Sequence, residues 1–118
     1  MSLLDRTCKQ PGIGDSPFSP EQAEQMLREV RDWTLEGAGI KREFQFKDFR
    51  EAMAFVNKVA DIAEGQGHHP DIFISYKTVR LVLTTHKIGG LSQNDFIVAA
   101  KIDQLQALPL FGKANQAN

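Results

Sequence analysis

The alternation of apolar and polar residues predicts two pairs of β-strands in this chain. One pair is expected over residues 33–35 and 40–46, where apolar residues of the second segment alternate with charged or polar neighbours. The other is expected over residues 72–76 and 79–85, which are rich in β-branched and aromatic side chains. Each pair is therefore predicted to form a hairpin with one dry face.

Apolar residues at helical spacing predict three helices. The first is expected to begin after Ser19, which can cap it, with Pro20 at the first helical position. The second follows Asp48 and runs to about Glu64, and the third opens after Ser92. The stripes that would face a sheet are Met26, Leu27 and Val30 in the first helix, Phe49, Ala52, Phe55, Val56, Val59 and Ile62/Ala63 in the second, and Phe96, Ile97, Ala100, Ile102 and Leu105 in the third.

The resulting order, α-β-β-α-β-β-α, predicts an α+β fold. We expect a four-stranded, largely antiparallel sheet with three helices packed on one face. Residues 19–108 are expected to form a single domain, with an extended N-terminal tail over 1–18 and a C-terminal tail over 109–118. The length of 118 residues suits one core and is too short for two.

Composition narrows the functional classes. The net charge of −1 and the lack of a run of lysines or arginines argue against direct nucleic-acid binding. No apolar run approaches the length that spans a membrane, and a cytoplasmic protein is the expectation. The single cysteine, Cys8, excludes an intrachain disulfide and a cysteine-rich zinc site, and we interpret it as a reduced bystander in the tail.

The chemistry-bearing residues gather in one region. All three histidines, His68, His69 and His86, lie between the end of the second helix and the residue that follows the last strand. The histidine side chain has an ordinary pKa of roughly 6.5, which lets it give or take a proton near neutral pH. Such a concentration is typical of a proton-transfer site or a metal site.

The register of the second hairpin bears on how the histidines meet. A turn centred on residues 77–78 pairs apolar residues on one face and, continued to the open end, places His69 opposite His86. Opposed residues of an antiparallel pair have Cβ atoms about 4.5–5.5 Å apart. We therefore expect these two imidazoles to meet on the face away from the helices, with His68 pointing elsewhere.

Two acidic residues are candidate partners of the histidines. Asp95 stands three positions after Ser92, so helix capping alone would explain it, although it can cap and still face the histidines. Glu64 ends the second helix, where a solvated charge is the ordinary interpretation. A catalytic zinc held by the three histidines is an alternative, but joint coordination by the adjacent His68 and His69 is awkward.

The spacing of the histidines and their acidic neighbours forms a pattern specific to one protein family. Glu64-x3-His68-His69-Pro70-x5-Tyr76-x9-His86-x8-Asp95 resembles the signature of the pterin-4a-carbinolamine dehydratases. The likeness covers roughly residues 18 to 106 and extends to the positions Trp33, Ile40, Arg42, Phe44, Phe46, Phe55, Val59, Ala60, Gly89, Gly90, Leu91, Asn94 and Phe96.

The resemblance implies the dehydration of 4a-hydroxytetrahydropterin to quinonoid dihydropterin, with no metal and no organic cofactor. It implies that His68, His69 and His86 line the pterin site, with Asp95 beside them. On that basis His69 and His86 are assigned acid–base work, His68 substrate binding and proton relay, and Asp95 the orientation of an imidazole. Which histidine is the acid and which the base stays open at this stage. Glu64 and Pro70 complete the expected substrate-binding residues.

The resemblance also implies a metabolic setting, and two alternative functions stay open beside the enzymatic one. Its members recycle the pterin cofactor of aromatic amino-acid hydroxylation, and some animal members are dimerisation partners of a transcription factor. A non-enzymatic binding module of the same fold is therefore one alternative, and a metal-dependent pterin-binding protein is another. Because the sheet would expose edge strands and an apolar outer face at Phe73 and Val82, a homodimer is expected. The resemblance adds the homotetramer as a further possibility.

Overall fold

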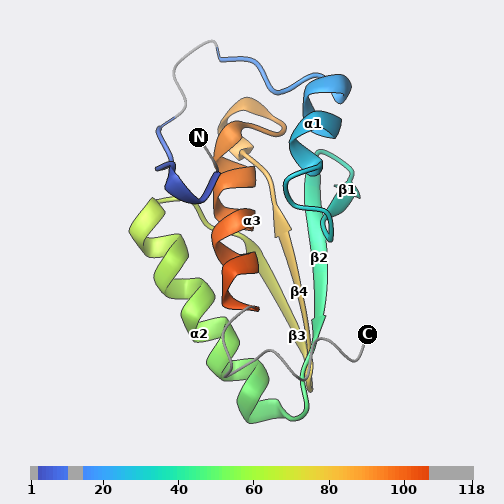
Figure 1. Cartoon of the computed structure of the whole chain (residues 1–118), viewed down its shortest axis with the longest axis vertical. Helices are drawn as coiled ribbons and strands as arrows, with labels where there is room; N and C mark the ends of the chain where they lie inside the picture. Colours follow the sequence, from blue (N-terminus) through green and yellow to red (C-terminus); the bar gives the residue numbers. More distant parts are fainter. Residues whose placement is uncertain (1–2, 11–14, 107–118) are drawn as a thin grey trace.

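The computed structural model describes residues 3–10 and 15–106 of the chain. Apart from two short 3-10 turns, labelled η, its elements follow the predicted order and confirm the α+β fold (Figure 1). They are η1 (Leu3–Asp5), α1 (Pro20–Leu27), β1 (Thr34–Glu36), β2 (Gly39–Gln45), α2 (Phe49–Gln66), β3 (Asp71–Ser75), β4 (Thr78–Leu83), η2 (His86–Ile88) and α3 (Gln93–Leu105).

The four strands form one antiparallel sheet in the order β1-β2-β4-β3. The two hairpins are therefore joined through their second strands, β2 and β4, and β3 lies at an edge. Figure 1 shows α2 and α3 side by side over one face of the sheet. The side chains of Ile40, Phe44, Val79, Leu81 and Leu83 point toward these helices and are fully or almost fully buried.

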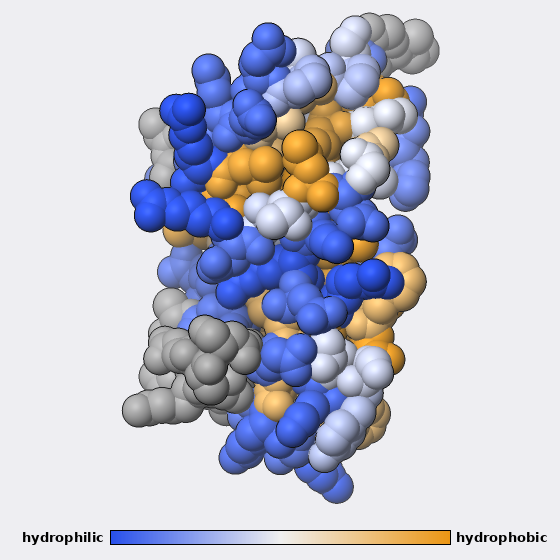
Figure 2. Space-filling view, turned by 90° about the vertical axis from the view of Figure 1, so that its right-hand side faces the viewer, coloured by the Kyte–Doolittle hydropathy of each residue, from blue (hydrophilic) through white to orange (hydrophobic). Residues whose placement is uncertain are grey.

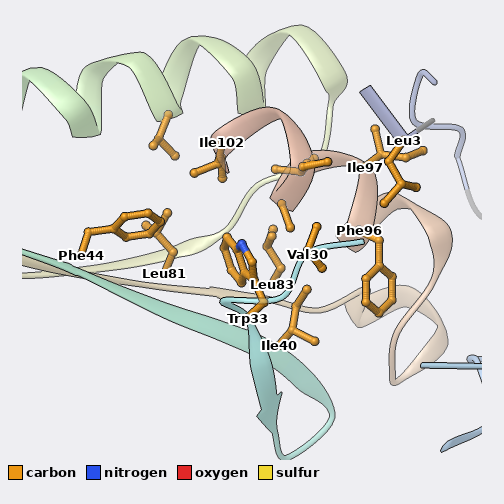
Figure 3. Close-up of a cluster of buried hydrophobic side chains, with 14 of the residues drawn as sticks. Leu3, Val30, Trp33, Ile40, Phe44, Leu81, Leu83, Phe96, Ile97 and Ile102 are labelled. Atoms are coloured by element: carbon orange, nitrogen blue, oxygen red, sulfur yellow. The ribbon is translucent and has the colours of Figure 1, made fainter. Parts of the chain in front are cut away.

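The core lies between the sheet and the helices. Figure 3 shows Trp33 and Phe44 near Leu81 and Leu83, beneath Ile102 of α3. The aromatic rings pack directly, and the centroids of Phe44 and Phe55 are 4.7 Å apart. By contrast, the side of the molecule in Figure 2 is mostly hydrophilic, with an apolar patch in its upper half and smaller apolar areas toward its right edge.

All three predicted helix starts are confirmed by their caps. Ser19 Oγ accepts from the Gln22 amide at 3.2 Å, and the Gln22 side chain accepts from the Ser19 amide at 2.8 Å. Asp48 caps α2 through the Glu51 amide, and Ser92 caps α3. Because cap preferences depend on residues three positions apart, they are legible in the sequence alone.

The predicted register of the second hairpin is wrong by two residues. Ser75 pairs with Thr78 and Ile74 with Val79, so the loop is only Tyr76 and Lys77. Tyr76 has a φ of 54°, the left-handed conformation that a two-residue hairpin loop needs and that a tyrosine rarely adopts. A shift of two keeps every side chain on its face, so the apolar pattern fitted both registers equally well.

The shifted register removes the predicted pairing of His69 with His86. Strand pairing between β3 and β4 starts at Asp71 and Val82, and β4 ends at Leu83. Beyond it the chain turns into η2, which His86 opens, and only an isolated bridge between Thr85 and Gly90 follows. The two histidines are thus not opposite each other in the sheet.

The N-terminal segment lies against the domain. Leu3 is 3% exposed and belongs to the main core cluster, where Figure 3 shows it near Ile97 of α3. These contacts were not expected of an extended tail, although the predicted domain boundary at residue 19 stays a prediction. The predicted C-terminal tail, residues 109–118, falls outside the described residues.

Candidate active site

One cleft of about 320 Å³ brings together the three histidines of the chain. Their side chains come from the segment between α2 and β3 and from η2. The residues that line the cleft are Cys8, Lys9, Gln10, Gln66, Gly67, His68, His69, Thr84, Thr85, His86, Lys87 and Asn94. The three histidines therefore converge as predicted, although the hairpin register that led to this prediction is wrong.

The end of α2 delivers His68 to the cleft. Gly67 ends the helix with a φ of 66°, a left-handed conformation that suits glycine, and the His68 amide still bonds to the Ala63 carbonyl at 3.2 Å. The chain therefore turns sharply just before His68. Its Nε2 atom lies 2.6 Å from Oδ1 of Asp95, and the side chain is 12% exposed.

Asp95 is fully buried and satisfies several donors at once. Its Oδ2 atom accepts from the Ser92 amide at 2.9 Å and from the Thr85 hydroxyl at 2.8 Å. Ser92 Oγ lies 2.7 Å from the same Thr85 oxygen. Because Thr85 gives its one proton to Asp95, the serine hydroxyl is the donor in that contact. Asp95 therefore caps α3 and faces a histidine, as the sequence allowed.

The hydrogen bonds around Asp95 determine which ring nitrogen of His68 carries a proton. A carboxylate only accepts hydrogen bonds, so Nε2 of His68 must be the donor to Asp95. The remaining ring nitrogen, Nδ1, is then the atom that can exchange a proton or accept from a ligand. Since hydrogen bonds to an ionised partner are short and strong, the imidazole is held in one tautomer and one orientation.

His69 has a different environment from its neighbour. Its Nε2 atom lies 2.6 Å from Oε2 of Glu64, but the side chains are 57% and 78% exposed. Glu64 was predicted to bind substrate, and in the structure it reaches the cleft only through His69. His86 is also exposed, and among the described residues no hydrogen bond involves its imidazole. Two of the three histidines thus have freedom to reorient.

Some cleft residues were missed by the sequence analysis, and one predicted residue is elsewhere. Thr85 is 3% exposed and bonds to Asp95, yet threonine at a strand end carries no distinctive signal. Asn94 and Gln66 line the cleft too, and only the contacts of the folded chain reveal them. Pro70, predicted to bind substrate, precedes β3 and is not part of the cleft lining.

Cys8 lies in the wall of the cleft rather than apart from the domain. Its amide donates to Oε1 of Gln66 at 2.9 Å, and its thiol lies 3.6 Å from the carbonyl of Asn94. The pKa of the Cys8 thiol is raised to about 11, first by burial and second by the nearby charge of Asp95, while Lys101 acts to lower it. The thiol is therefore protonated and a poor nucleophile near neutral pH.

Two other structural observations concern metal and membrane. Within residues 3–10 and 15–106, histidine, cysteine, aspartate and glutamate side chains nowhere form a group of three able to hold a metal ion. In the same described part of the chain, no helix has the length and apolar character needed to cross a membrane.

Comparison with known proteins connects this site to a family. The family model described as pterin 4 alpha carbinolamine dehydratase matches residues 16–105. Proteins provisionally named as pterin-4-alpha-carbinolamine dehydratases are similar to this chain. That of Halorhodospira halophila is 47% identical over 109 residues, covering 91% of this chain and 100% of the relative. That of Nostoc sp. is 51% identical over 88 residues, covering 75% and 95%.

Solved structures are similar as well. A crystal structure described as a transcriptional coactivator/pterin dehydratase from Brucella melitensis matches with a TM-score of 0.72 and 32% identity, covering 76% of this chain and 98% of that chain. A pterin dehydratase-like protein identified as a RuBisCO assembly factor in the alpha-carboxysome matches with a TM-score of 0.52 and 22% identity, covering 62% and 84%. The second match shows the shared fold alone.

Proposed function

This chain belongs to the pterin 4 alpha carbinolamine dehydratase family, and we propose that it eliminates water from a 4a-hydroxytetrahydropterin to give quinonoid dihydropterin. Such an activity makes it a hydro-lyase. The observation that carries the proposal is the cleft in which His68, His69 and His86 converge, with His68 held by the buried Asp95. The names of relatives that cover most of this chain support the same reaction.

The proposed mechanism divides the proton transfers among the histidines. Loss of water from C4a requires a proton for the departing hydroxyl and removal of the proton from N5. We assign this acid–base work to His69 and His86, whose exposed imidazoles can adjust to a ligand. His68, oriented by Asp95, binds the pterin and relays protons through Nδ1. Each acid or base role is worth about 10²–10⁴ in rate.

Turnover by the purified protein tests this function. We expect dehydration of 4a-hydroxytetrahydropterin well above the spontaneous rate, with unchanged activity after dialysis against a strong chelator. No acceleration would contradict the enzymatic proposal and favour a binding module. Activity lost on chelation and restored by zinc would favour the metal-dependent alternative.

The setting proposed with this activity is pterin cofactor recycling after aromatic amino-acid hydroxylation in the cytoplasm. The regulatory alternative draws support from the Brucella melitensis protein, which is described both as a coactivator and as a pterin dehydratase. Two measurements test the setting. One is turnover of the substrate by the purified protein, and the other is growth of a gene-deletion strain under conditions that require phenylalanine hydroxylation. Normal growth of the deletion strain under those conditions would contradict it.

We also propose that the chain forms a symmetric homodimer through β3. This edge strand has four exposed residues of five, and Phe73 and Ile74 are 47% and 40% exposed, with Tyr76 at 65% in the loop beyond. Exposed apolar edge strands pair readily with other chains. Light scattering at micromolar concentration should therefore give at least twice the monomer mass, and Ile74→Lys should shift it toward the monomer. A wild-type monomer would contradict the proposal.

A further inference from the structure

A short N-terminal segment forms part of the cleft although it precedes the region matched by the family model. We call residues 3–10 the N-terminal strap. Figure 1 shows it in dark blue against the ends of α2 and α3. Leu3 anchors its start in the core, and Nζ of Lys101 on α3 donates to the Leu4 carbonyl at 2.8 Å. Its last residues, 8–10, line the cleft.

Side chains from both helices hold the strap in place. The amide group of Asn94, which is 7% exposed, accepts from the Lys9 amide at 3.0 Å and donates to the Lys9 carbonyl at 2.6 Å. Gln66 accepts from the Cys8 amide at 2.9 Å. Because both backbone groups of Lys9 are satisfied by one buried side chain, the position of this residue at the cleft is fixed by the domain and not by the strap alone.

The lining of the cleft is positive although the whole chain has a net charge of −1. Lys9 lines it from the strap and Lys87 from η2, while no aspartate or glutamate is among the lining residues. The carboxylates that adjoin the cleft, Asp95 and Glu64, each lie 2.6 Å from a histidine nitrogen. Within the described residues, neither lysine forms an ion pair with a carboxylate. Both lysines are exposed beside the histidines, and Asp15 lines an adjoining cleft together with Lys9.

From this arrangement we infer that the pterin bound here carries an anionic substituent, a carboxylate or a phosphate, which Lys9 and Lys87 recognise. The inference rests on the dehydratase function proposed above and names its substrate class. Elimination of water occupies the histidines and leaves the lysines without a part in the chemistry. An anion on the pterin side chain would lie close to both cations and gain from their attraction. The strap is then a specificity element of the site.

Binding of two stable, fluorescent pterins tests the inference. We expect the protein to bind pterin-6-carboxylate about tenfold more tightly than 6-hydroxymethylpterin at low salt, because each lysine contributes about threefold at a distance of several ångströms in water-rich surroundings. The preference should shrink between about 0.01 M and 0.15 M salt, as the Debye length falls from about 30 Å to 8 Å. Equal affinities at low salt would overturn the inference.

Variants separate the two lysines from general charge effects. Lys9→Gln and Lys87→Gln should each reduce the preference about threefold, and the double variant should abolish it. Lys58→Gln, an equal change of charge on an exposed position of α2 outside the cleft, is the matched control and should leave the preference intact. A loss in the control as large as in the cleft variants would overturn the role of Lys9 and Lys87.

The strap itself has a separate test. Asn94→Ala removes the clamp but no charge, so it should lower the preference as much as Lys9→Gln does. An unchanged preference would overturn the positioning role of the clamp. Turnover of a neutral carbinolamine with no preference between the two pterins would sustain the proposed function and reject this inference. A clear preference without turnover would reject the proposed function and leave the anionic ligand class standing. Failure of both pterins to bind would overturn this inference, while turnover would still decide the proposed function.

Discussion

Two histidine–carboxylate pairs lie at the same cleft and have the same length but differ in burial. His68 and Asp95 are 2.6 Å apart with side chains 12% and 0% exposed. His69 and Glu64 are also 2.6 Å apart, with side chains 57% and 78% exposed. His68 and His69 are adjacent in the sequence, yet the partner of His68 is buried and the partner of His69 lies at the surface.

The difference in burial determines what each pair can do. Asp95 accepts two further hydrogen bonds, from Ser92 and Thr85, so losing it would leave several buried groups without partners. Water and salt screen the Glu64 pair, and such exposed pairs contribute about 0–1 kcal/mol. The distance alone therefore says little about energy. The buried pair fixes an imidazole, whereas the exposed pair leaves one able to move.

The largest combined effect, on stability as well as on turnover, is expected on removing the buried carboxylate. Asp95→Ala should lower the free energy of unfolding by about 2–4 kcal/mol, combining a lost helix cap with unsatisfied buried donors. It should also lower kcat by about 10²-fold, because His68 loses its orientation. Urea unfolding and steady-state kinetics measure the two effects. The control is Ser92→Ala, which weakens the cap but keeps the carboxylate, so kcat should change much less. Reduced stability with normal kcat would make Asp95 a helix cap only.

The exposed histidines should affect catalysis and not stability. His69→Ala and His86→Ala should each lower kcat by about 10²–10⁴. The free energy of unfolding should change by about 0.5 kcal/mol or less, since both side chains are exposed. Stopped-flow assays and urea unfolding distinguish the two quantities. Near-normal turnover in either variant would show that its imidazole takes no part in proton transfer.

Removing the exposed carboxylate should have a small effect. Glu64→Gln is expected to change the free energy of unfolding by at most about 1 kcal/mol, with a difference that disappears at high salt. Thermal unfolding at low and high ionic strength measures it. A loss as large as that of Asp95→Ala would mean that burial does not distinguish the two pairs.

The smallest effect is a change in the titration of Cys8. Its pKa is raised to about 11, first by burial and second by the charge of Asp95. Asp95→Asn should therefore lower the thiol pKa while leaving it above its ordinary value, because burial is the larger cause. The pH dependence of alkylation by iodoacetamide measures this shift. An unchanged profile would indicate that Asp95 carries no charge near the thiol.

Short-range patterns made most of the fold predictable from the sequence. The helix starts at Ser19, Asp48 and Ser92 follow from residues only three positions apart, and the sheet faces follow from strict alternation. The hairpin register was not predictable in the same way. It depends on one tyrosine in a left-handed conformation, and a shift of two residues leaves the apolar pattern unchanged.

The candidate site was predictable in its histidines but not in its surroundings. Side-chain chemistry marks His68, His69 and His86 as soon as they cluster in the sequence. By contrast, the clamp between Asn94 and Lys9 joins residues far apart in the chain, and ordinary polar residues carry no local signal for such a contact. Their roles arise from tertiary packing.

The capping of α3 by Asp95 ties the site to local unfolding. Proteins open in small cooperative units whose free energies are lower than that of global unfolding. When the first turn of α3 opens, the Ser92 amide and Nε2 of His68 lose the same carboxylate together. Amide hydrogen exchange at that turn should therefore report how often the candidate site comes apart. We therefore expect His68 to keep its orientation only as long as this helical turn stays closed.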